Sequence, residues 1–69
     1  MEREPVISKD IASIGYDSSS AILEIEFNSG GVYDYFDVPQ FIHDELMAAE
    51  SKGKYFHANI KNSYSTSRV

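Results

Sequence analysis

Cysteine and tryptophan are absent from this chain, and its longest aliphatic stretch is only Ala21-Ile22-Leu23. Without cysteine, a disulfide framework and every thiolate metal site are excluded, and a reducing compartment is favoured. No stretch approaches the roughly 20 apolar residues of a membrane-spanning helix. The N-terminus also lacks the basic start and apolar run of a signal peptide. We therefore expect a soluble, cytoplasmic protein.

The chain is short but rich in aromatic residues. A domain of 69 residues buries only about 60% of the surface that its unfolded chain exposes. Its core must therefore be built from a few large side chains. The 5 Tyr and 4 Phe meet that need, because each aromatic ring can bury roughly 150–250 Å². We expect a single domain over residues 1–69, with residues 1–5 and 67–69 frayed.

Alternation of apolar and polar residues over positions 11–37 predicts three short strands. The first covers 11–16, and the second is the clearest, because Leu23, Ile25 and Phe27 alternate with glutamates. A glycine-containing turn at 29–31 leads into the third strand, which we expect over 32–38. Short connections imply an antiparallel meander.

The length of the turn at 29–31 decides which face the third strand presents. A two- or four-residue loop would bury Asp34 beside Ile25 without a partner, which is costly. A three-residue loop pairs Asn28 with Val32, and glycine supplies the positive φ that such loops commonly need. This register places Tyr33 opposite Phe27 and Tyr35 opposite Ile25, all on the core face. The outer face then carries Glu24, Glu26, Asp34 and an exposed Phe36.

Helical spacing predicts a main helix that begins at Pro39, a residue suited to the first helical position, and contains Ile42 and Leu46. Gly53 is expected as its left-handed cap. A short second helix is expected over 54–60, and residues 61–69 form a tail or edge strand. The predicted fold is therefore α+β: a three-stranded antiparallel meander packed on one main helix, followed by a short helix and a C-terminal edge strand. A small SH3-like barrel is the structural alternative.

Groups suited to catalysis are not arranged in pairs or clusters. His43, Asp44 and Glu45 are consecutive, so on a helix their side chains point in different directions. A zinc-binding helix would need a second histidine where Met47 stands. We therefore expect no enzymatic activity, no metal or other cofactor, and no small-molecule substrate.

Charge is divided unevenly along the chain. Residues 1–50 hold all 11 acids and two bases, a net charge of −9, whereas residues 51–69 hold four bases and no acid, a net charge of +4. Aromatic residues are interleaved with these bases, as in proteins that bind single-stranded nucleic acid. A purely structural role, with cations at a helix end and aromatics in the core, is the simpler interpretation. The candidate nucleic-acid-binding residues are Lys52, Lys54, Lys61, Tyr64 and Arg68.

Several short pieces of the chain, in this order and spacing, resemble the KTSC domain family, which is named for its occurrence at the C-terminus of some lysyl-tRNA synthetases. The pieces are Ile14-Gly15-Tyr16-Asp17, Leu23 to Phe27 with Gly31, Tyr33-Asp34-Tyr35, Val38-Pro39, and Ala49 through Tyr64. The resemblance covers roughly residues 6–66 and implies a small domain without catalytic residues, for which RNA binding is suggested by context. His57 stands where the family often has asparagine. The motif residues that we expect to be structural are Tyr33, Tyr35, Pro39, Gly53, Phe56 and Ile60.

Two functional hypotheses follow. The first is a small non-catalytic module that binds RNA or another nucleic acid through the basic C-terminal segment. The alternative is a protein-interaction or self-association module that uses a sheet edge or an exposed aromatic patch to bind a protein partner or form a homo-oligomer.

Overall fold

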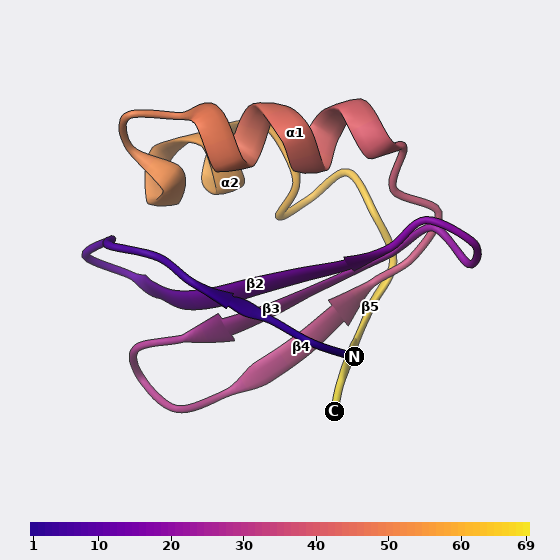
Figure 1. Cartoon of the computed structure of the whole chain (residues 1–69), viewed down its shortest axis with the longest axis horizontal. Helices are drawn as coiled ribbons and strands as arrows, with labels where there is room; N and C mark the ends of the chain where they lie inside the picture. The colour runs from indigo at the N-terminus through magenta and orange to yellow at the C-terminus, as the bar shows by residue number, and fades with distance from the viewer.

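An antiparallel sheet with two helices on one of its faces makes up the computed structural model, which describes residues 1–69 (Figure 1). The elements in chain order are β1 (Glu4–Pro5), β2 (Ile11–Asp17), β3 (Ile22–Phe27), β4 (Val32–Tyr35), α1 (Gln40–Ala48), α2 (Lys52–Asn59) and β5 (Thr66–Arg68). Strand order in the sheet follows chain order. The α+β class is confirmed, and so is the meander, which is β2 to β4.

The prediction of three strands is corrected to five. The expected C-terminal edge strand is β5, and β1 pairs with β2 at the opposite edge. Both edge strands come from the chain ends that we expected to fray. Strand β1 has only two residues, Glu4 and Pro5, so no alternating pattern announces it. Because β1 and β5 do not pair with each other, the sheet does not close into the alternative barrel.

The β3–β4 turn has the predicted length but not the predicted position. Its three residues are 28–30, and the strand pairs are Ile25 with Tyr33 and Leu23 with Tyr35. The expected register was therefore wrong by two residues, although the faces were right, because a shift of two preserves them. Gly30 adopts the left-handed φ of 109°. At Gly31 the Tyr33 ring lies so close that a Cβ atom would be 2.8 Å from it.

The core lies between the inner face of the sheet and the two helices. Phe56 of α2 is its centre, with edge-on ring contacts to Tyr35 at 5.5 Å and to Phe27 at 5.3 Å. The buried hydrophobic residues are Ile11, Ile14, Leu23, Ile25, Tyr35, Val38, Ile42, Leu46, Phe56 and Ile60. Phe36, expected to be exposed, is half-buried just beyond β4, where its N–H donates to the Ser65 carbonyl.

The connections to the helices differ from the predictions in three details. Strand β4 ends at Tyr35, and the third strand does not reach Val38, because Asp37 adopts a left-handed φ of 59° and turns the chain. Pro39 is the N-cap of α1 and not its first helical residue. Gly53 lies inside the first turn of α2 and caps nothing, because Ser51 is the N-cap there. Neither helix has the length and apolar character that a membrane crossing requires.

Candidate nucleic-acid interface

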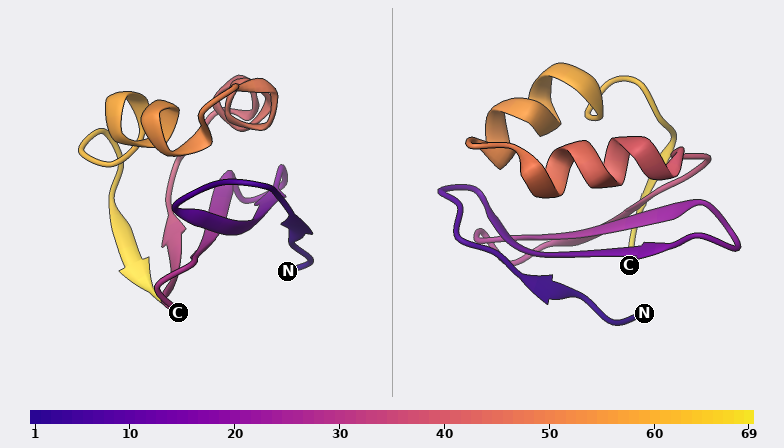
Figure 2. Two further views of the ribbon diagram at one scale, coloured as in Figure 1. Left: turned by 90° about the vertical axis from the view of Figure 1, so that its left-hand side faces the viewer. Right: turned by 45° about the horizontal axis from the view of Figure 1, so that its top comes forward.

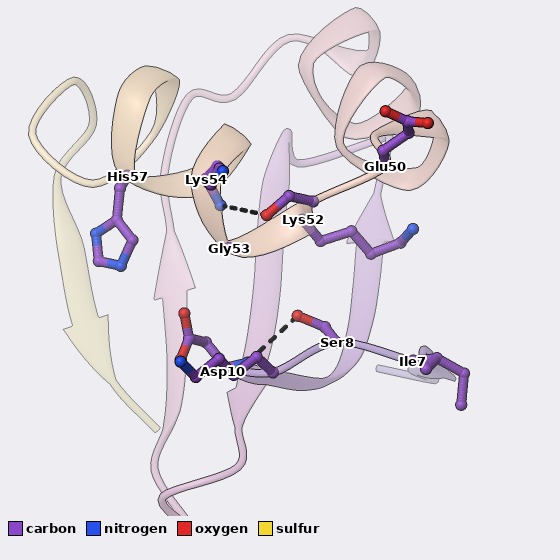
Figure 3. A pocket seen from close by; sticks show the side chains of 10 residues that line it. Ile7, Ser8, Asp10, Glu50, Lys52, Gly53, Lys54 and His57 are labelled. Atoms are coloured by element: carbon purple, nitrogen blue, oxygen red, sulfur yellow. Dashed lines mark hydrogen bonds between the residues drawn. The ribbon is translucent and has the colours of Figure 1, made fainter.

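A surface hollow of about 500 Å³ lies between the first turn of α2 and the loop that leads into β2 (Figure 3). Its lining is polar apart from one exposed isoleucine, and three of its residues are lysines. We call it the lysine hollow. The lining residues are Ile7, Ser8, Lys9, Asp10, Glu50, Ser51, Lys52, Gly53, Lys54 and His57.

Asn28 in the β3–β4 turn holds the loop side of the lysine hollow in place. Its side-chain amide donates to the carbonyls of Ser8 at 3.0 Å and Lys9 at 2.9 Å. Its backbone N–H donates to the carbonyl of Asp10 at 2.9 Å. Three consecutive carbonyls are therefore bound by one residue, which fixes the backbone from which the Lys9 side chain extends.

The helix side of the lysine hollow is the N-terminal turn of α2. The Ser51 hydroxyl accepts a hydrogen bond from the backbone N–H of Lys54 and caps the helix. The Lys52 ammonium donates to the Ala49 carbonyl at 3.1 Å. The ammonium groups of Lys9 and Lys54 make no hydrogen bond or ion pair within the chain, so both are available to an anionic ligand.

Acidic residues offset part of the charge of the lysine hollow. Asp10 and Glu50 line it together with Lys9, Lys52 and Lys54, so the formal charge is only +1 with His57 neutral. The Asp10 carboxylate lies close to α2, since a Cβ atom at residue 53 would be 2.7 Å from it. The geometry therefore favours weak binding of anions that depends strongly on salt.

Half-buried aromatic rings lie next to the lysine hollow. A second hollow shares Lys9, Asp10 and His57 with it and is also lined by Phe27. The Phe27 ring makes an edge contact with the Tyr33 ring at 5.9 Å. The guanidinium of Arg68 on β5 lies over the Tyr33 ring, 5.7 Å from its centroid, in cation–π geometry.

The structure brings some of the predicted binding residues together and separates others. Lys52 and Lys54 line one hollow, and Arg68 lies by the neighbouring aromatic rings. Lys61 follows the end of α2, and Tyr64 is half-buried against the core. Neither lines a hollow.

Lys9 belongs to the lysine hollow but was missed in the sequence. The division of charge assigned Lys9 to the acidic part of the chain, far in sequence from Lys52 and Lys54. The hydrogen bonds from Asn28 hold the backbone of this loop, and the close approach of Asp10 to Gly53 brings the loop beside α2. We recognise no sequence pattern that predicts the contact between this loop and α2.

Tyr64 packs against the core near Tyr55. Its neighbour Tyr55 on α2 donates its hydroxyl to the carboxylate of Glu45 on α1 at 2.6 Å. Burial, together with that hydrogen bond and the charge of Glu45, raises the pKa of Tyr55 to about 12, and Tyr64 adds to the shift. These groups hold α2 against α1.

The six motif residues that we expected to be structural lie mostly in the core. Tyr35, Phe56 and Ile60 are buried and Tyr33 is half-buried at its margin, while Gly53 meets Asp10. Pro39 is exposed at the start of α1. Elsewhere, His43 stacks on the Tyr16 ring at 5.1 Å, and no group of three or more metal-ligating side chains is close enough to hold a metal ion.

Comparison with known proteins identifies the family. Residues 7–64 match the KTSC domain family. The chain belongs to this family. A crystal structure of a KTSC domain protein from Yersinia pestis matches it with a TM-score of 0.97 and 41% identity, covering 99% of this chain and 96% of that one. The resemblance seen in the sequence is thereby confirmed, and so is the α+β class of the fold.

KTSC relatives occur as small proteins and as parts of larger ones. A protein of Tsukamurella paurometabola is 40% identical over 58 residues, which cover 84% of this chain and 87% of that protein. An uncharacterised protein of Stutzerimonas stutzeri is 39% identical over 61 residues, 88% of this chain and 86% of that one. A lysine–tRNA ligase of Trichormus variabilis is 49% identical over 49 residues, but these cover 71% of this chain and only 9% of the ligase.

Proposed function

We propose that this KTSC domain is a non-catalytic module that binds single-stranded RNA, with phosphate groups in the lysine hollow. The observation that carries the proposal is the convergence of Lys9 with Lys52 and Lys54, from distant parts of the chain, on one hollow. Ammonium groups that meet on one surface bind phosphates and release counterions, which supplies most of the affinity for a nucleic-acid backbone.

The neighbouring aromatic rings favour a single strand over a duplex. Proteins that bind single strands combine a positively charged groove with aromatic rings on which bases stack. Phe27 and Tyr33 are half-exposed beside the lysine hollow, and Arg68 extends the positive surface. The acid-free segment 51–69 forms one side of the molecule, where α2 lies above the edge formed by β4 and β5 (Figure 2).

The relatives agree with an RNA partner. A region of a lysine–tRNA ligase is similar to this chain, and that enzyme's name includes an RNA. The chain covers only 9% of the ligase, so the ligase's own activity is not transferred. What is proposed for the KTSC domain is RNA contact alone.

The test is a titration of the purified protein into a fluorescein-labelled oligouridine, followed by fluorescence anisotropy at several salt concentrations. We expect weak binding that falls steeply with salt. Lys9→Ala should weaken binding and reduce the slope of log affinity against log salt by about 0.7, the value for one phosphate contact on a single strand. Lys61→Ala is the matched control, since it removes the same charge outside the hollow.

Two results would contradict the proposal. One is the absence of binding at high micromolar protein and low salt. The other is an equal loss of affinity in Lys61→Ala and Lys9→Ala, which would show that net charge and not the hollow decides binding.

The alternative, interaction through a sheet edge, has less support. The two edges of the sheet are β1, which has two exposed residues and contains Pro5, and β5, which has three exposed residues and includes Arg68. Short, charged edge strands are a means by which proteins avoid edge-to-edge pairing. Light scattering over a range of concentrations tests this alternative, and a strict monomer would remove its homo-oligomer version.

A further inference from the structure

The N-terminal residues 1–5, which we call the strap, run along the β2 edge of the sheet (Figure 2) and pack on the outer side of β2 and β3, away from the helices. Strand β1 pairs Glu4 with Ile14 and Pro5 with Ser13. At Gly15 the strap passes so closely that a Cβ atom would lie 2.5 Å from the backbone oxygen of Glu2. The strap therefore packs on a place where β2 has no side chain.

Beneath the strap lies a polar network that spans three strands. The Arg3 side chain pairs with the carboxylate of Glu24 on β3 and donates from Nε to the Ser13 hydroxyl at 3.0 Å. The Ser13 hydroxyl in turn donates to the Glu26 carboxylate at 2.9 Å. Glu24 is only 7% exposed, so Arg3 is both its cover and its counterion.

Glu24 lies directly opposite Asp34 in the β3–β4 ladder. Side chains that lie directly opposite in an antiparallel pair have Cβ atoms roughly 4.5–5.5 Å apart, so the two carboxyl groups are close neighbours on the outer face and repel each other when both are ionised. The second oxygen of Asp34, Oδ1, is buried and has no partner. A proton bound by one of two neighbouring carboxyl groups removes one negative charge and with it their mutual repulsion.

The charged surroundings assign that proton to Asp34. Burial raises the pKa of the Asp34 carboxyl, and the hydrogen bond and charge of Glu24 raise it further. Burial also raises the pKa of Glu24, but the hydrogen bonds from Asp34 and Arg3 and the charge of Arg3 outweigh it, so that this pKa is lowered overall. The groups that face the pair are Arg3 and the N-terminal ammonium of the strap, Ser13 of β2, Glu26 of β3 and Ser67 of β5.

We propose that the strap is a pH-sensitive latch, which Arg3 closes over a Glu24–Asp34 carboxyl pair that shares one proton. When both carboxyls are protonated, Arg3 has no charged partner on Glu24 and the strap opens. Ionisation of Glu24 closes the latch. Ionisation of Asp34 at higher pH strengthens the attraction to Arg3 but sets two carboxylates against each other across β3 and β4.

Carbon-13 NMR of the two carboxyl groups, together with backbone relaxation of residues 2–4, tests this proposal in the full chain. We expect the strap to become ordered in step with the ionisation of Glu24. Asp34→Asn should keep that step and remove the upper titration, because an asparagine amide donates to Glu24 without a titrating proton. Arg3→Gln should raise the pKa of Asp34 further, since the positive charge that lowers it is lost. A purely structural role for Arg3 would not produce that shift.

Glu4→Gln is the matched control, because it removes a strap carboxylate that takes no part in the network, and it should leave both titrations unchanged. The proposal is overturned if strap order does not change with pH. It is also overturned if Asp34 titrates at its ordinary value in the wild type. Asp34→Asn keeps a side chain of the same shape, with a donor, opposite Glu24, so it tests the proposal independently if Arg3→Gln fails to fold.

Discussion

The two faces of the sheet consist of alternate residues of the same strands, yet different interactions hold them. On the inner face, Leu23 and Ile25 are completely buried beneath the helices. On the outer face, Glu24 between them is nearly as buried, but under the strap and against Arg3. One strand thus contributes to an apolar core and to a charged network within three consecutive residues.

The two faces differ in what they contribute to the free energy of unfolding. Apolar burial on the inner face and ion pairing on the outer face differ in size and in how they respond to pH and salt. Complete burial of an aliphatic side chain contributes about 1.5–3 kcal/mol and responds little to pH or salt. A partly exposed ion pair contributes about 0–1 kcal/mol and weakens in salt. We therefore expect the inner face to set the free energy of unfolding, and the outer face to set how that free energy changes with solution conditions.

The inner face should show the largest effect of a single substitution. Ile25→Ala removes a side chain that is 0% exposed and should lower the free energy of unfolding by about 3 kcal/mol, through lost burial and the cavity left behind. Urea denaturation measures this change. Phe41→Ala is the control, because a ring that is 59% exposed should cost no more than about 0.5 kcal/mol. Equal costs for the two variants would show that burial on this face does not dominate.

Detaching the strap from the outer face should lower the free energy of unfolding by less than the loss of a core side chain. In Gly15→Ala the new methyl group would meet the Glu2 backbone, so the strap must move away. Because the rest of the sheet can stay folded, the loss is limited to strap docking, about 1–2 kcal/mol. Amide exchange should increase in residues 1–5 and stay unchanged in β2 to β4. Protection that is retained in the strap of this variant would contradict the strap packing described above.

The inner face could be predicted from the sequence, and the cover of the outer face could not. Alternation in Leu23, Ile25 and Phe27 identifies the strand. The cost of burying Asp34 favours a loop with an odd number of residues over one with two or four. The exact turn could not be chosen, because 28–30 and 29–31 are both three-residue loops that contain glycine. In the folded chain the turn 28–30 is closed by the hydrogen bonds between Phe27 and Gly31 and between Gly30 and Phe27.

The site shows the same limit. Lys52 and Lys54 were candidates because segment 51–69, to which they belong, contains no acid. Lys9 joins the site through contacts between segments far apart in sequence, such as the hydrogen bonds from Asn28 to the loop that contains Lys9. The strap was missed for a related reason, since Arg3 looks like an isolated charge until the sheet brings Glu24 beneath it. Local periodicity predicts faces, whereas contacts between distant polar residues depend on the assembled sheet.

The smallest effect is expected from Ser13→Ala, which breaks the outer network at its centre. The Ser13 hydroxyl joins Arg3 to Glu26, and its loss should cost about 1 kcal/mol, because both charged partners still reach water. Urea denaturation at low and high salt measures the cost, with the exposed turn residue Ser29→Ala as control. The cost should be nearly the same at both salt concentrations, since serine carries no charge, whereas the cost of Arg3→Gln should fall as salt increases. A cost of Ser13→Ala as large as that of Ile25→Ala would mean that the outer network, and not the apolar core, is the main source of stability.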